Sequence, residues 1–161
     1  NFLDMLTHGR SGSELLQEMA PNEPAFRSLV RSWFAHSSLF EMLRRLAATD
    51  SVVVLTTDHG CVMSNKATMV HGNRDTSTSL RFKFGKSLRC DPKNALFLKD
   101  PDQYGLPSVG EGTNFIFAKE DYYFVYPTRF HEYQRQYANS FQHGGISMEE
   151  MILPVAVMQG R

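Results

Sequence analysis

Apolar residues recur at helical spacing through the first third of the chain. In one stretch they fall on a single helical face, at Phe26, Leu29, Val30, Trp33 and Phe34. This spacing predicts an amphipathic helix, and Pro24 suits its first turn. A second helix is predicted over residues 38–47, and a shorter one over residues 14–20 with Ser13 as its N-cap.

The clearest strand is predicted over residues 51–57, with sequence SVVVLTT. Its core, Val52–Leu55, is apolar at successive positions, which is typical of a parallel strand covered by helices on both faces. Residues 2–3, directly before Asp4, resemble the end of another buried strand. The helices between these two segments would then form the crossover that parallel strands need. We therefore expect an α/β fold with a mainly parallel sheet and flanking helices.

The middle of the chain is polar and weakly periodic. Alternation predicts strands over residues 78–83 and 95–98. Residues 114–118 and 122–126 predict a β-hairpin, and residues 130–140 predict a helix.

The last part of the chain carries the signal of a helix N-terminus. Ser147 and Glu150 have the spacing of a capping box, which opens a short helix. Residues 153–158 then predict a closing strand, in which Pro154 stands near the start, where a missing N–H is tolerated.

The composition is that of a globular protein without strong net charge. Lys and Arg number 17 and Asp and Glu 17 among 161 residues, which argues against a nucleic-acid coat or a polybasic membrane patch. The apolar runs are shorter than the roughly 18 residues of a membrane helix, so no membrane partner is expected. The two cysteines, Cys61 and Cys90, are too few for a disulfide framework, and we expect a cytoplasmic location. The first residue is Asn1, which suggests a piece of a larger protein.

Three short motifs carry carboxylates and imidazoles: Asp4-x-x-x-His8, Thr57-Asp58-His59-Gly60 and Gln142-His143-Gly144-Gly145. The first two follow predicted strands, and ligand sites in open α/β sheets lie at the carboxyl ends of strands. Asp and His are natural ligands of zinc and related divalent ions. Each motif has a simpler reading as well: a contact on a helix surface, a turn with a capping Asp, and a loop. Their joint occurrence favours a metal site.

At this point the motifs resemble those of a known family. The segment VVVLTTDHG, followed much later by FQHGGISMEEMILPV, is similar to the PglZ-type domain of the alkaline phosphatase superfamily. The resemblance is strongest to the effector domain of response regulators of type IX secretion, and it covers essentially the whole chain. It implies that residues 1–161 are a single PglZ-type domain fragment.

The resemblance implies two zinc-type ions that lie a few ångströms apart. One ion would be bound by Asp4, His8 and His143, and the other by Asp58 and His59. The remaining ligands in the family are an upstream Asp and the nucleophile, a Thr or Ser. Both precede the matched region, so the catalytic nucleophile is expected before residue 1, and residues 1–161 alone are expected to be inactive.

The function implied for the intact domain is two-metal hydrolysis of phosphodiesters, with nucleotides or oligonucleotides as substrates. The expected setting is the output domain of a two-component response regulator, with a histidine kinase or secretion-regulation proteins as partners and a second copy of the chain in a homodimer. The alternative is a catalytically inactive relative that serves dimerisation or partner binding. The five retained ligands favour the enzyme, whereas the absent nucleophile segment favours the alternative for this polypeptide alone.

Residues 74–86 are locally basic, with Arg74, Arg81, Lys83 and Lys86. Two readings stay open: these cations contact substrate phosphates, or they form the solvated face of a strand.

Overall fold

The computed structural model describes residues 2–9, 12–72, 78–107 and 110–161, with the side chains of Phe2 and His8 excepted. The chain forms two units. The first unit comprises Asn1–Asp58 and Leu153–Arg161, and the second comprises His59–Ile152.

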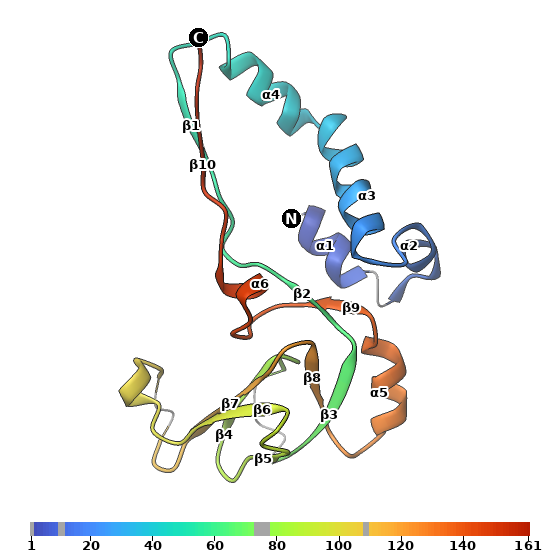
Figure 1. Ribbon diagram of the computed structural model, residues 1–161, viewed down its shortest axis with the longest axis vertical. Helices are drawn as coiled ribbons and strands as arrows, with labels where there is room; N and C mark the ends of the chain where they lie inside the picture. Colours follow the sequence, from blue (N-terminus) through green and yellow to red (C-terminus); the bar gives the residue numbers. More distant parts are fainter. Residues whose placement is uncertain (1, 10–11, 73–77, 108–109) are drawn as a thin grey trace. The chain divides into compact units, whose positions relative to one another are not determined.

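The first unit begins with the helices α1 (Phe2–Gly9), α2 (Glu14–Met19), α3 (Glu23–Ala35) and α4 (Ser38–Leu46). They follow one another in the part of the ribbon that runs from blue to cyan in Figure 1. Three of them start where a polar side chain caps the first turn. The Oγ of Ser13 accepts from the Leu16 amide at 3.3 Å, Asn22 Oδ1 from Ala25 at 3.0 Å and Ser37 Oγ from Phe40 at 3.1 Å. The three predicted helices are confirmed.

The segment before Asp4 is helical, so the prediction of a strand over residues 2–3 is wrong. Two apolar residues are too few to separate a strand from a helix. In α1 they continue a helical pattern that reaches the buried Leu6, and Asp4 lies in the first turn, where the helix dipole favours an acid. The helices therefore lead from α1 to a strand and do not connect two parallel strands.

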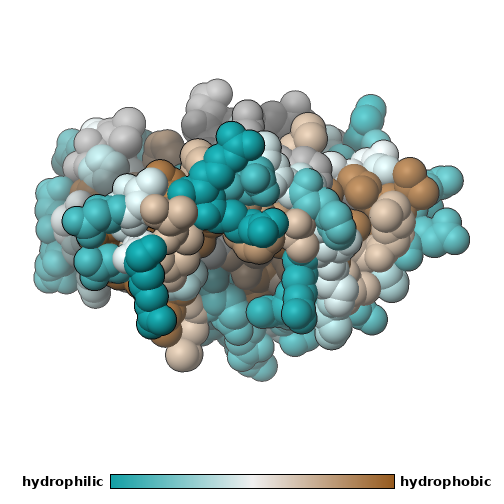
Figure 2. Space-filling model, turned by 90° about the horizontal axis from the view of Figure 1, so that it is seen from above, coloured by the Kyte–Doolittle hydropathy of each residue, from teal (hydrophilic) through white to brown (hydrophobic). Residues whose placement is uncertain are grey.

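Strand β1 (Val52–Leu55) is also paired differently from the prediction. It forms a two-stranded antiparallel ribbon with β10 (Ala156–Gln159), in which Val52 lies opposite Gln159 (Figure 1). Val52 and Val54 are 62% and 59% exposed, so the prediction of a strand buried on both faces is wrong. Figure 2 shows hydrophobic residues, in brown, beside hydrophilic ones on one face of the molecule.

The described residues of the second unit form three small sheets. Strands β2 (Val62–Ser64) and β9 (Ser140–Gln142) pair antiparallel. A second sheet has the order β5 (Arg89–Cys90), β3 (Lys66–His71), β8 (Tyr122–Val125), and a third has the order β4 (Phe82–Gly85), β7 (Asn114–Ala118), β6 (Ala95–Leu98). The unit also contains the 3-10 helix η2 (Asp102–Tyr104), α5 (Phe130–Tyr137) and α6 (Met148–Met151).

Among the described strands, β3 and β8 form the parallel pair, and the other pairs are antiparallel. The fold is mixed α/β with small sheets, and the predicted mainly parallel sheet is wrong. The predicted hairpin is wrong too, because β7 pairs with β4 and β6 whereas β8 pairs with β3. Both strands are buried along nearly their whole length, so no alternation in the sequence identifies their partners.

The core of the second unit gathers apolar side chains from several strands: Val70, Leu88, Ala95, Ile116, Ala118 and Phe124.

Near this core, the strand β4 buries a cation. Lys83 is 3% exposed, and its Nζ lies 5.1 Å from the centroid of the Tyr126 ring. Burial lowers the pKa of Lys83 from 10.5 to about 8.

No helix within the described ranges has the length and apolar character that a membrane crossing requires.

The buried Lys83 predicts a pH dependence of stability. Between pH 8 and 10.5 the folded state has released the Lys83 proton while the unfolded state keeps it, so raising the pH favours folding. From pH 8 to 10 we expect the free energy of unfolding to gain about 1 kcal/mol per pH unit relative to Lys83→Met. Urea unfolding of both proteins across this range measures the difference. Parallel pH profiles for the two proteins would contradict the prediction.

Candidate metal centre

His59 lies at the start of the second unit, between Asp58 and a glycine that packs tightly. The amide of Gly60 donates to the carbonyl oxygen of Glu150 at 3.0 Å. A Cβ on Gly60 would lie 1.9 Å from the carbonyl oxygen of Glu149, so only glycine lets the two backbones approach this closely. The glycine of this motif therefore allows close backbone packing directly after His59.

His143 follows strand β9 and precedes two glycines. Gly144 has φ +90°, a conformation that side-chain-bearing residues rarely adopt. The antiparallel register of β2 and β9 places Val62 opposite Gln142. Since His59 lies shortly before β2 and His143 directly after β9, this pairing brings the two histidines to the same end of the two-stranded sheet.

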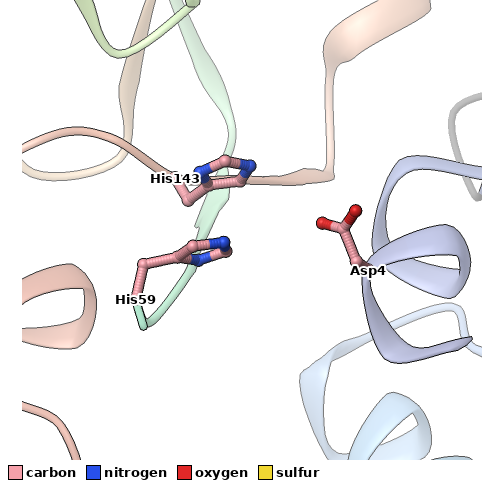
Figure 3. Close-up of side chains that lie close together, drawn as sticks. All are labelled: Asp4, His59 and His143. Carbon is pink, nitrogen blue, oxygen red and sulfur yellow. The ribbon is translucent and has the colours of Figure 1, made fainter. Parts of the chain in front are cut away.

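The two imidazole rings lie face to face, as Figure 3 shows. Their centroids are 3.9 Å apart and their planes differ by 10°. A ring nitrogen of one lies within 4.8 Å of a ring nitrogen of the other. Both residues are half-buried. The structure thus brings together two of the five predicted ligands, one from each predicted ion.

The ring of His59 is oriented by its own backbone. Its Nδ1 lies 3.0 Å from the carbonyl oxygen of Gly60. Because a carbonyl oxygen only accepts, Nδ1 carries the proton in this hydrogen bond, which makes Nε2 the nitrogen with the lone pair in the neutral ring. Histidines that bind metal ions usually donate their other ring N–H in this way.

The pair fits the metal centre that the resemblance implies. Two-metal sites hold their ions about 3.5–4 Å apart. The two imidazoles stand side by side, with ring centroids 3.9 Å apart, so two donors for such a site are present together. Neutral imidazole is a common ligand of divalent metal ions.

The other predicted ligands lie in the first unit. Asp4 is an exposed residue of α1, labelled in Figure 3, and His8 lies on the same helix with its side chain outside the described part of the structure. Asp58 is exposed, and the hydroxyl of Thr57 lies 3.5 Å from its Oδ1. Asp4, His8 and Asp58 stay predicted ligands.

A buried ion pair that no sequence motif predicts lies beside the connection that carries His143. The guanidinium of Arg81 donates from Nε to Oε1 of Glu150 at 3.0 Å and from Nη2 to Oε2 at 2.9 Å. The two side chains are 0% and 1% exposed. Both readings of the basic segment are therefore wrong for Arg81, which is paired internally; Arg74 lies outside the described residues.

Glu150 also completes the predicted capping box of α6, which the structure confirms. Its carboxylate accepts from the amides of Gly145 at 2.9 Å and Ser147 at 3.1 Å. Burial would raise the pKa of Glu150, but the hydrogen bonds and charge of Arg81 and the two amides outweigh burial and leave this pKa below its usual value. In the sequence, the capping-box spacing indicates a structural role for Glu150, but it does not indicate that Arg81 is its partner.

Comparison with known protein families matches residues 1–158 to the BREX system PglZ alkaline phosphatase-like domain. The match covers nearly the whole chain, so the chain belongs to the PglZ family. The alkaline phosphatase superfamily generally uses metal ions, in agreement with the histidine pair. No curated protein matches the chain.

The tight packing at Gly60 gives a stability prediction. Gly60→Ala places a methyl group against the Glu149 carbonyl oxygen and should lower the free energy of unfolding by about 1–3 kcal/mol. The matched control is Gly12→Ala, because a Cβ there would meet nothing within 4 Å. Urea unfolding measures both variants, and equal effects of the two substitutions would contradict the packing argument.

Proposed function

We propose that the intact domain is a zinc-dependent phosphodiesterase or phosphatase, with His59 and His143 on two neighbouring ions. One observation carries this proposal: in a chain of the alkaline phosphatase-like PglZ family, the two motif histidines lie ring to ring at 3.9 Å. An ordinary loop histidine would not need a second imidazole as its neighbour, nor glycines that close the backbone around it.

The remaining ligands are assigned from the sequence resemblance. Asp4 and His8 join His143 on one ion, and Asp58 joins His59 on the other. Metal ions so placed polarise the phosphoryl oxygen and lower the pKa of an attacking hydroxyl. The backbone of this chain positions the two imidazoles, since the Gly60 carbonyl holds the His59 ring and Gly144 turns the chain behind His143.

The substrate and the biological setting follow from the same resemblance. We assign phosphodiesters of nucleotides or oligonucleotides as substrates, and the output domain of a cytoplasmic response regulator in type IX secretion as the setting. The motifs VVVLTTDHG and FQHGGISMEEMILPV support this assignment. A histidine kinase would act upstream of such a protein, and a second copy of the chain would be its partner in a homodimer.

The first test of this function is metal binding. His59→Ala and His143→Ala in the full-length protein should each lower the bound zinc, because each removes a ligand of a different ion. Equilibrium dialysis followed by elemental analysis measures the zinc per chain. His131→Ala, an exposed histidine on α5, is the matched control and should leave zinc binding unchanged. Unchanged zinc in all three variants would remove the metal centre.

The second test is catalysis. In the full-length protein, Asp58→Ala should lower hydrolysis of a nitrophenyl phosphodiester by roughly 10³-fold or more, because the loss of one ion removes several kcal/mol of transition-state stabilisation. A chelator should abolish the activity of the unsubstituted protein, and added zinc should restore it. Full activity of Asp58→Ala would refute the two-metal mechanism, and an inactive protein that binds zinc would favour a binding module.

A further inference from the structure

Glu150 connects the two loops that carry the paired histidines. Its main-chain carbonyl oxygen accepts from the amide of Gly60, the residue after His59, at 3.0 Å. Its side-chain Oε1 accepts from the amide of Gly145, two residues after His143, at 2.9 Å. One residue therefore holds the backbone beside both imidazoles.

The carboxylate of Glu150 is itself held from the opposite side by Arg81. The bidentate pair fixes both carboxylate oxygens, and a third group, the amide of Ser147, donates to Oε2. Arg81 is anchored in turn: its Nη1 donates to the carbonyl oxygen of Tyr122, and its own carbonyl oxygen accepts from the amide of Ala118 at 2.8 Å. The position of Glu150 is thus set by the sheets of the second unit.

The packing around Glu150 leaves no room for adjustment. A Cβ on Gly145 would lie 2.5 Å from Oε2 of Glu150 and 3.0 Å from Nε of Arg81. A Cβ on Gly60 would lie 1.9 Å from the carbonyl oxygen of Glu149. Both histidine loops therefore approach α6 through a glycine, and both are hydrogen-bonded to Glu150.

We propose that Glu150, held by Arg81, is a positioning residue that fixes the separation of the His59 and His143 rings and so lets them bind two ions together. It acts through the backbone beside each ring. The role of Glu150 in metal binding rests on the proposed function. Its coupling of the two loops rests on its hydrogen bonds with Gly60 and Gly145.

The test uses Glu150→Asp in the full-length protein. Aspartate keeps the charge that Arg81 needs, but it is shorter by one methylene and cannot reach Arg81 and Gly145 together. Substitution of residues that orient metal ligands typically lowers metal affinity about 10–100-fold, and we expect a loss of this size in zinc titrations. Glu149→Asp is the matched control, because Glu149 is the exposed neighbour on the same helix, and it should bind zinc like the unsubstituted protein.

A second readout is free of metal. In the metal-free protein each stacked imidazole shields the ring protons of the other, and NMR of the histidine rings detects this shielding. Glu150→Asp should reduce the shielding at both His59 and His143, whereas Glu149→Asp should retain it. Urea unfolding of the same proteins separates this effect from a general loss of stability.

The outcomes are distinguishable. Lower stability of Glu150→Asp with unchanged zinc affinity and unchanged shielding would show a purely structural role and overturn the inference. If the unsubstituted protein binds no zinc, the proposed function fails, and the shielding alone decides whether Glu150 couples the rings. If Glu150→Asp does not fold, Arg81→Lys is judged by the same measurements, because lysine keeps the charge but loses the bidentate contact.

Discussion

The second unit is organised around a charged pair that has no access to water. Burying a carboxylate and a guanidinium costs several kcal/mol per ion unless their hydrogen bonds are satisfied. Here each oxygen of Glu150 has two donors, one from Arg81 and one from a backbone amide. The removal of one partner from such a pair leaves an uncompensated buried charge, which typically costs about 3–5 kcal/mol. The connection between β9 and α6 donates both of these amides and is thereby held in one arrangement, and His143 lies on the same connection.

The helices could be predicted from the sequence because their signals are local. Caps such as Ser13 and the apolar spacing of residues 26–34 lie within a few residues of the structure that they specify. The pairing of strands could not be predicted, because β7 and β8 are both buried along nearly their whole length and their sequences do not distinguish one partner from another. The same ambiguity makes Val52–Leu55 look like a central parallel strand, although among the described strands it pairs only with β10, and antiparallel.

The candidate site divides in the same way. His59 and His143 could be found because each lies in a short motif with a glycine, and the pairing of β2 with β9 then brings them together. The pair of Arg81 and Glu150 could not be found, since the two residues are 69 positions apart and neither belongs to a motif that names the other. A buried arginine also looks like any other cation in a basic segment, so composition around residues 74–86 points to the surface.

The chain between His59 and His143 comprises nearly all of the second unit, so this unit must fold before the two rings can meet. The chain leaves His59, forms the three sheets and returns through β9 to His143, so the ring pair exists only when β2 and β9 have paired. The amides of Gly60 and Gly145 both donate to Glu150, which is a second connection between the two ends of this segment. A two-metal centre that needs both rings therefore forms on the folded unit and not on the unfolded chain, and mass action then makes the bound ions stabilise the fold that presents the rings. Backbone contacts have already fixed the imidazoles in parallel planes. Metal binding therefore loses less free energy to the ordering of these two side chains.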